Sequence, residues 1–215
     1  MAAYRPLVLV LDFDGTVTQK DLGDEVCERF APAAWRDIDL LWMRNQISLP
    51  DAQRQMWAMV RAERAEALAY AHAVGHERPG LDALLDQVAK RGGESWLASG
   101  GFDFYIEAIL GDRLARFQRS YYNHTRFTEA GVEVAFPHAD LACDRCAVCK
   151  GKVCDLARAT GAEVVFAGDG TSDRCVVGRV DTVFAVENSH LARHCDAHGA
   201  AYRSFRSFDE LARAL

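Results

Sequence analysis

The hydrophobic positions near the start form one uninterrupted run, residues 7–11, which ends in the polar segment Asp12-Phe13-Asp14-Gly15-Thr16. A run of Leu and Val without a polar interruption is typical of a strand that is buried on both faces of a sheet. Shorter apolar runs at residues 96–98, 164–167 and 183–186 predict further strands, separated by segments of helix length. This alternation predicts an α/β protein with a doubly wound, mostly parallel sheet.

Residues 21–76 show a different pattern, without any comparable strand run. Apolar residues such as Met56, Val60 and Leu68 recur here at helical spacings among Ala, Arg and Glu. We therefore expect an insertion of three or four helices. The sequence predicts two parts: an α/β core formed by residues 1–17 and 78–215, and a helical cap formed by residues 18–77.

The pattern also predicts several elements of the second half. Apolar residues at 81, 84, 85 and 88 share one face of an expected helix, which Gly92-Gly93 would end. A further helix is expected to start near Phe102. Residues 117–122 and 132–136 flank Glu129-Ala130-Gly131 and predict a strand pair, and residues 207–215 predict a closing helix.

Charge and hydropathy narrow the expected partners. The 215-residue chain has a formal net charge of −6 and no block of Lys and Arg, so nucleic acid and anionic membranes are poor candidates. The apolar run at residues 7–11 is too short to span a bilayer or to act as a signal sequence. The sequence therefore predicts a cytoplasmic protein that does not bind membranes.

Three polar turns each follow a predicted strand and carry the candidate chemistry. They contain Asp12 and Asp14, then Ser99, then Asp169 and Asp173. The carboxyl ends of parallel strands line the ligand crevice of an open sheet, so these side chains are expected to converge. Crowded carboxylates repel unless a cation or a proton lies among them, and Mg²⁺ favours such oxygen ligands. A carboxylate can also attack phosphorus and form an aspartyl-phosphate.

These motifs resemble those of the haloacid dehalogenase superfamily of hydrolases. The segment Asp12-Phe13-Asp14-Gly15-Thr16 is similar to its D-x-D-x-T signature, and Ser99 with Gly100-Gly101 is similar to its second motif. Lys150 is placed as the lysine of the third motif, and the segment from Gly168 to Asp173 resembles the acidic fourth motif. The resemblance covers nearly the whole chain, and the helical insertion is similar to the cap of the phosphoserine-phosphatase-like branch.

The resemblance implies a Mg²⁺-dependent phosphatase. It implies that Asp12 is the nucleophile, that Asp14 is the general acid and then the general base, and that Lys150 screens the charge on Asp12 and the phosphoryl group. The aspartate two residues after the nucleophile favours a phosphatase over a dehalogenase. The residues implied to bind phosphate or substrate are Thr16, Ser99, Gly100 and Asp21. The residues implied to bind Mg²⁺ are Asp12, Asp14, Asp169 and Asp173.

Within that branch, residues 35–48 and 201–208 and the run Cys143-x2-Cys146-x2-Cys149-Lys150 resemble the 2-hydroxy-3-keto-5-methylthiopentenyl-1-phosphate phosphatases of methionine salvage. The run Cys149-Lys150-Gly151 also resembles phosphoethanolamine/phosphocholine phosphatases, which stay an alternative beside phosphoserine phosphatases. The expected partner is thus a small phosphorylated metabolite, and we expect a monomer or a homodimer.

Several alternatives stay open at this stage. Lys152 competes with Lys150 as the catalytic lysine. Cys143, Cys146, Cys149 and Cys154 have spacings that suit Zn²⁺ but also suit plain buried thiols. The functional alternatives are a phosphotransferase that uses an alcohol acceptor, and a non-enzymatic scaffold that binds zinc.

Overall fold

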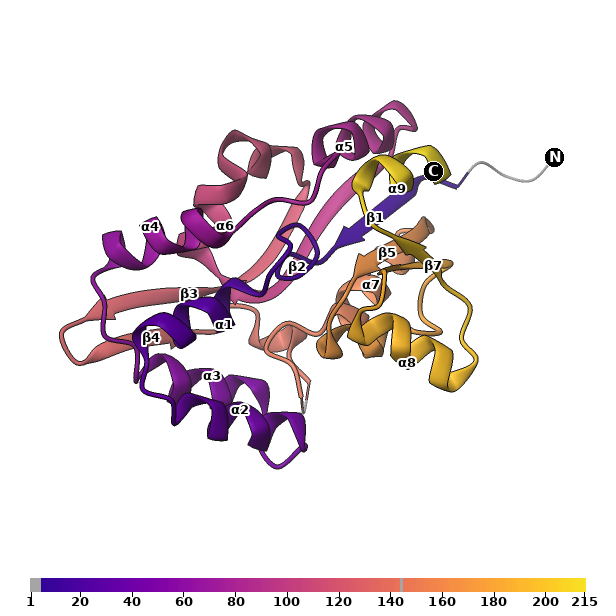
Figure 1. Cartoon of the computed structure of the whole chain (residues 1–215). Coiled ribbons are helices and arrows are strands. Elements are labelled where there is room, and N and C mark those ends of the chain that lie inside the picture. Colours follow the sequence, from indigo (N-terminus) through magenta and orange to yellow (C-terminus); the bar gives the residue numbers. More distant parts are fainter. Residues whose placement is uncertain (1–4, 144) are drawn as a thin grey trace.

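The structure is a computed structural model that describes residues 5–143 and 145–215. Its centre is a seven-stranded sheet in the order β4-β3-β2-β1-β5-β6-β7, parallel except for β4, which runs antiparallel to β3 (Figure 1). The strands are β1 Leu7–Leu11, β2 Glu94–Phe102, β3 Arg119–Thr128, β4 Gly131–Ala135, β5 Glu163–Gly168, β6 Thr182–Val186 and β7 Arg203–Phe205. The predicted doubly wound α/β fold is confirmed.

Helices cover both faces of the sheet because its central strands are apolar on both sides. Leu7, Leu9 and Leu11 of β1 pack with α5 (Leu81–Lys90) and α9 (Phe208–Ala214). Val8 and Val10 point to the opposite face and pack with α7 (Lys150–Ala159) and α8 (His190–His198). The uninterrupted apolar run at the start of the chain thus builds two cores, one on each side of β1.

The helical segment after β1 contains α1 (Leu22–Phe30), α2 (Trp35–Met43), α3 (Leu49–Trp57) and α4 (Arg64–Val74). The chain enters and leaves this segment side by side, because Thr18 pairs with Glu77 and the Arg78 N–H donates to the Val17 carbonyl at 2.7 Å. This pairing suits a division at residues 17/18 and 77/78, which we propose as the boundary between core and cap.

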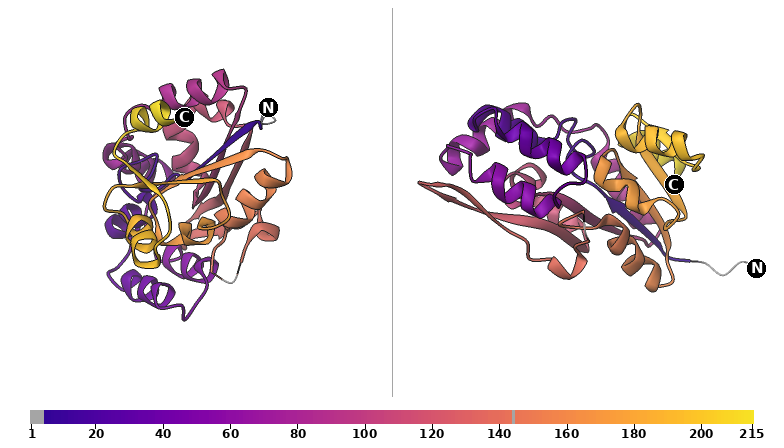
Figure 2. Two further views of the ribbon diagram at one scale, coloured as in Figure 1. Left: turned by 90° about the vertical axis from the view of Figure 1, so that its right-hand side faces the viewer. Right: turned by 90° about the horizontal axis from the view of Figure 1, so that it is seen from below.

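Strand β2 differs from the prediction, since it continues through Ser99 and the two glycines before α6 (Asp103–Leu110) begins. The predicted strand pair is the antiparallel hairpin β3–β4, which extends along the helical segment and packs against the end of α3 (Figure 2). The short edge strand β7 was not predicted from the sequence. The remaining elements are the 3-10 helices η1 (Gly111–Arg116), η2 (Ala139–Leu141) and η3 (Thr171–Val176).

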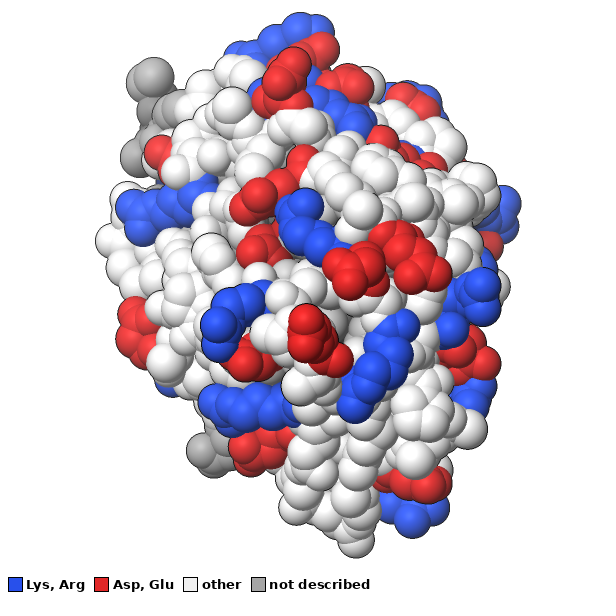
Figure 3. Space-filling model, turned by 90° about the vertical axis from the view of Figure 1, so that its left-hand side faces the viewer, with Lys and Arg blue, Asp and Glu red and all other residues white. Residues whose placement is uncertain are grey.

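The charge of the surface and the polarity of the helices indicate which partners the protein can bind. On the face drawn in Figure 3, basic and acidic side chains are interspersed, without a broad basic area. Within the described residues, each helix is too short or too polar to cross a membrane.

Candidate active site

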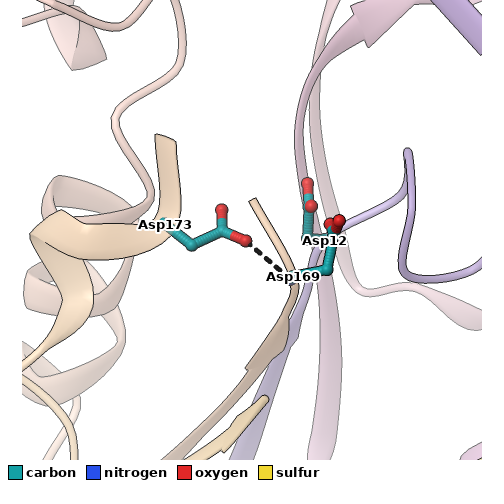
Figure 4. Close-up of side chains that lie close together, drawn as sticks. All are labelled: Asp12, Asp169 and Asp173. Carbon is teal, nitrogen blue, oxygen red and sulfur yellow. Dashed lines mark hydrogen bonds between the residues drawn. The ribbon is translucent and has the colours of Figure 1, made fainter. Parts of the chain in front are cut away.

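Three aspartates meet where β1 and β5 end, as expected from the strand order. Asp12 follows β1, Asp169 follows β5, and Asp173 lies on η3 (Figure 4). One carboxylate oxygen of each lies within 4.8 Å of the others, and the side chains of Asp12 and Asp173 are buried. Strands β1 and β5 are neighbours in the sheet, so segments more than 150 residues apart supply one cluster.

Lys150 neutralises part of this cluster. Its Nζ lies 3.0 Å from Asp12 Oδ1 and 2.9 Å from Asp173 Oδ1, and it donates to Ser172 Oγ at 2.8 Å. Burial alone would lower the pKa of Lys150, but the two carboxylates outweigh it and hold the pKa well above its ordinary value. Lys152 lies elsewhere, where its Nζ donates to the carbonyl of Ala142.

The loops around the cluster are fixed by hydrogen bonds and by glycine. Asp173 Oδ2 accepts the N–H groups of Asp169 (2.9 Å) and Gly170 (2.8 Å). Thr16 Oγ1 lies 3.1 Å from Asp169 Oδ1 and 3.4 Å from Asp12 Oδ2, and so links two of the carboxylates. Gly15 has φ +72°, and a Cβ atom there would lie 2.3 Å from Asp169 Oδ2. A side chain at residue 15 would therefore displace Asp169.

Asp14 is not part of the group of three aspartates and has hydrogen-bond partners of its own. Its Oδ1 accepts the Leu22 N–H at 3.0 Å, and its Oδ2 accepts the Tyr105 hydroxyl at 2.9 Å and the Ser99 hydroxyl at 3.5 Å. Burial, and then the nearby charge of Asp21, raise the pKa of Asp14 well above its ordinary value. A raised pKa favours the protonated form of this carboxyl, which is the form that a general acid requires.

The donor set fits a hard divalent cation. Burial, and then the neighbouring aspartates, raise the pKa of Asp12 to about 7 and that of Asp169 to about 8. Lys150 supplies only one positive charge for three carboxylates, so negative charge remains uncompensated. A divalent cation would offset this repulsion and restore the ionised forms, and its preference for oxygen ligands matches the cluster.

A cavity of about 330 Å³ opens from the cluster toward the helical segment. Its wall on the core side includes Asp12, Asp14, Ser99, Gly100 and Lys150, while its far wall comes from α1, α2 and α3. The far wall combines carboxylates with large apolar side chains. Its members include Asp21, Asp24, Asp39, Trp42, Met43, Leu49, Met56 and Trp57.

Sequence comparison places this architecture in a known family. Residues 9–177 match the profile of the haloacid dehalogenase-like hydrolases. The chain belongs to this family.

Two curated relatives illustrate its place among these hydrolases. It is 26% identical over 210 residues to a 2-hydroxy-3-keto-5-methylthiopentenyl-1-phosphate phosphatase of Bacillus pumilus, covering 96% of this chain and 89% of that protein. It is 28% identical over 215 residues to the Geobacillus kaustophilus enzyme of the same name, covering 98% and 96%. Both relatives carry the name of a phosphatase, and the family match makes this chain a haloacid dehalogenase-like hydrolase.

A solved structure shows the same fold. The phospho-aspartyl intermediate analogue of a phosphoserine phosphatase superposes with a TM-score of 0.73 at 16% identity. The match covers 98% of this chain and 99% of the other. At that identity the likeness shows the fold of the hydrolase alone.

The hydrolase brings together most of the residues that the sequence singled out. Ser99 is buried, and its hydroxyl oxygen accepts the Gly101 N–H at 2.9 Å. The Gly100 carbonyl accepts the side-chain amides of Gln53 and Asn123, each at 2.8 Å. Asp21 caps α1 by accepting the Asp24 N–H at 3.0 Å, and it lines the cavity. The Asp14 side chain lies outside the cluster of three, so its expected role in binding metal stays a prediction.

Sequence reasoning missed Tyr105 in this hydrolase, and it named Gly101 in the second motif without giving it a role. Tyr105 is fully buried on α6, and its hydroxyl donates to Asp14. A Cβ atom at Gly101 would lie 2.2 Å from both Asp14 Oδ2 and the Tyr105 hydroxyl oxygen, so only glycine leaves room for this pair. The only available signals were one polar hydroxyl in an apolar helix and the second glycine after Ser99.

Proposed function

We propose that this hydrolase is a Mg²⁺-dependent phosphatase that acts through an aspartyl-phosphate on Asp12. The arrangement of Asp12 supports the proposal best: it is buried, it is paired with Lys150 at 3.0 Å, and it lies beside two further aspartates. The related proteins carry phosphatase names, and one neighbouring structure is described as a phospho-aspartyl intermediate analogue. Asp12, Asp169 and Asp173 would hold the cation, which would supply positive charge against the phosphoryl oxygens.

The first half of the reaction assigns distinct tasks to Asp12 and Asp14. A carboxylate oxygen of Asp12 attacks phosphorus, and the bond between phosphorus and the ester oxygen breaks. Asp14, whose pKa is raised by burial, gives its proton to the departing alkoxide, so the substrate leaves as an alcohol. Lys150 holds a positive charge within 3.0 Å of Asp12 and stabilises the negative charge that spreads over the phosphoryl group.

The second half returns the enzyme to its starting state. Asp14, now ionised, takes a proton from water while the water oxygen attacks phosphorus. The bond from phosphorus to Asp12 breaks, and inorganic phosphate leaves. Ser99 would hold a phosphoryl oxygen through its hydroxyl, and Tyr105 keeps the Asp14 carboxyl oriented through a 2.9 Å hydrogen bond.

The far wall of the cavity favours a substrate with an uncharged, partly apolar body. Met43, Met56 and Trp57 offer apolar surface that suits a methylthio group. Lys150 is the only Lys or Arg among the described residues that line the cavity, and it is already paired with Asp12 and Asp173. A substrate carboxylate would therefore meet repulsion. We propose 2-hydroxy-3-keto-5-methylthiopentenyl-1-phosphate as substrate.

A second candidate rests on the acidic part of the same wall. Asp21, Asp24 and Asp39 line the cavity, and the charge of Asp21, followed by partial burial, raises the pKa of Asp24 to about 8. A substrate ammonium group would relieve this repulsion, and Trp42 could contact it through its ring face. Phosphoethanolamine or phosphocholine is therefore the alternative substrate. For phosphoserine, the attraction of its ammonium group is offset by the repulsion of its carboxylate.

Phosphate release from a panel of phosphorylated metabolites tests these proposals. With Mg²⁺, we expect release that EDTA abolishes and that Asp12→Asn reduces by about 10³-fold or more, because no other group can form the covalent intermediate. Asp12→Asn should keep a cooperative thermal transition. Activity that survives Asp12→Asn would disprove the nucleophile, and transfer of phosphate to added alcohols in place of release would favour a phosphotransferase.

A variant of the far wall separates the two substrates. Asp39→Asn should raise the KM for phosphoethanolamine about tenfold and leave that for the methylthiopentenyl ester nearly unchanged, because only the first carries a positive charge. Equal effects on both would exclude a direct role of Asp39 in selecting charge. A cytoplasmic location and a monomer or homodimer remain predictions.

A further inference from the structure

A second cluster of possible metal ligands lies behind Lys150, outside the aspartate site. Cys149 precedes Lys150 directly as the N-cap of α7, and its sulfur lies 3.6 Å from the sulfur of Cys175 on η3. The thiols of Cys143 and Cys146 also interact with the Cys149 sulfur. The Cys143 N–H donates to the Cys146 carbonyl at 3.0 Å, which links these two cysteines.

The cysteines of this cluster differ from the set predicted by their spacing in the sequence, because Cys175 takes the place of Cys154. Cys154, the fourth cysteine of the predicted set, is fully buried in the core between α7 and the sheet, among apolar residues such as Val8 and Val153. Cys175 takes the place beside Cys149, although 26 residues separate them. The structure thus joins the Cys143-x2-Cys146-x2-Cys149 segment to the loop that carries Asp173.

We propose that Cys143, Cys146, Cys149 and Cys175 bind one Zn²⁺ ion in a structural site that ties the Lys150 segment to the Asp173 loop. Zn²⁺ in structural sites takes four cysteine sulfurs at about 2.3 Å, which places neighbouring sulfurs about 3.8 Å apart. The Cys149–Cys175 pair, at 3.6 Å, already matches one edge of such a tetrahedron. Each thiol that binds gives its proton to solvent.

The surroundings favour an anionic centre of this kind. The Gly151 N–H at the start of α7 donates to the Cys175 sulfur at 3.3 Å, and the N–H of Lys152 donates to the Cys149 sulfur.

Binding requires the sulfurs of Cys143 and Cys146 to move closer to the Cys149–Cys175 pair. Among the described residues, no three cysteine sulfurs lie mutually within 4.8 Å, so the segment must contract around the ion. The ion would then fix both Lys150 and the loop of Ser172 and Asp173, whose contacts with Lys150 measure 2.8 and 2.9 Å. The site would therefore stabilise the catalytic arrangement without touching substrate.

Metal analysis of the intact chain tests the proposal. The protein is purified under reducing conditions without chelator, and its zinc is measured in wild type, Cys175→Ala, Cys149→Ala and Cys154→Ala. We expect equimolar Zn²⁺ in wild type and in Cys154→Ala, and loss of zinc in the other two variants. Cys154→Ala is the matched control because it removes a buried thiol of the same segment without removing a proposed ligand.

Two further measurements locate the ion. Asp169→Asn should retain the zinc, which would separate the thiol site from the aspartate site. Exchange with Co²⁺ should give the visible absorption of a tetrahedral thiolate complex. Removal of zinc should lower the thermal midpoint of wild type but not that of Cys175→Ala.

The proposal is overturned by metal-free protein that does not take up added Zn²⁺, by zinc that is lost in Cys154→Ala but kept in Cys175→Ala, or by a Cys149–Cys175 disulfide without metal.

Discussion

The two walls of the active-site cavity differ in how completely their polar groups are paired. On the core side, Lys150 has three side-chain partners, and Asp173 accepts two backbone N–H groups while it pairs with Lys150. On the far side, Trp42 Nε1 and Gln53 Oε1 are buried and have no hydrogen-bond partner among the described residues. Both residues line the cavity.

This contrast matches two different tasks. Phosphoryl transfer needs the same fixed positions for any ester, so its groups are held by partners within the protein. A buried polar atom without a partner costs roughly 1–3 kcal/mol, a cost that a substrate atom can remove when it binds. We therefore propose that the core wall carries the reaction and that the far wall, whose polar atoms are partly unpaired, selects the substrate.

The largest expected loss of activity comes from substitution of Asp14, the proposed general acid on the core wall. Asp14→Asn removes the transferable proton and should lower kcat about 10²-fold or more for an alkyl phosphate. The loss in the rate of the first half-reaction should be much smaller for p-nitrophenyl phosphate, because p-nitrophenolate leaves without needing a proton. Single-turnover measurement of leaving-group release from both esters checks this, because it does not depend on the later attack of water. An equal loss of that rate on the two esters would contradict the assignment of Asp14 as general acid.

A smaller effect is expected from the residue that orients this acid. Tyr105→Phe removes the 2.9 Å hydrogen bond to Asp14 and should lower kcat about tenfold. The hydrogen bond lowers the pKa of Asp14, so its loss should move the limb of the pH–rate profile that reports Asp14 to higher pH. Tyr122→Phe is the matched control, because the Tyr122 hydroxyl bonds Glu107 at the surface. An unchanged profile in Tyr105→Phe would remove Tyr105 from the site.

The core wall was largely predictable from sequence, and the reason is topological. Asp12, Lys150 and Asp169 each stand at the boundary of a strand or helix whose pattern is visible in the sequence. Parallel strands bring such boundaries to one edge, whatever the intervening chain does. Sequence alone did not decide between Lys150 and Lys152. The choice requires the start of α7, whose first residue is Lys150.

The far wall and the cysteine cluster could not be predicted in this way. Which face of α2 or α3 meets the cavity depends on how the helices pack, and Trp42 reads equally well as a core residue. Tyr105 reaches Asp14 because α6 starts only after β2 has continued past Ser99, which the short apolar run did not indicate. Cys175 joins Cys149 through contacts between α7 and η3, for which spacing along the chain gives no signal.

The far wall can be tested through one of its unpaired atoms. Trp42→Phe removes the buried Nε1 and should raise KM several-fold, with a thermal midpoint that is unchanged or slightly higher. Trp35→Phe is a close control, because Trp35 Nε1 is also buried without a partner among the described residues but Trp35 does not line the cavity. If both variants leave KM unchanged, the unpaired atoms of α2 have no part in substrate selection.

The smallest expected effect is a change in thermal stability when one negative charge of the far wall is removed. The charge of Asp21, followed by partial burial, raises the pKa of Asp24 from 3.8 to about 8 in the folded protein. Between these values the folded state holds a proton that the unfolded state has released, so stability falls as pH rises through this window. Asp24→Asn should therefore raise the thermal midpoint slightly above pH 8 and leave it nearly unchanged near about pH 4. Asp37→Asn, on the exposed face of α2, controls for the loss of one negative charge. A gain that is independent of pH, or equal in both variants, would show that crowding among Asp21, Asp24 and Asp39 does not limit stability, and would remove the electrostatic reason for a cationic substrate.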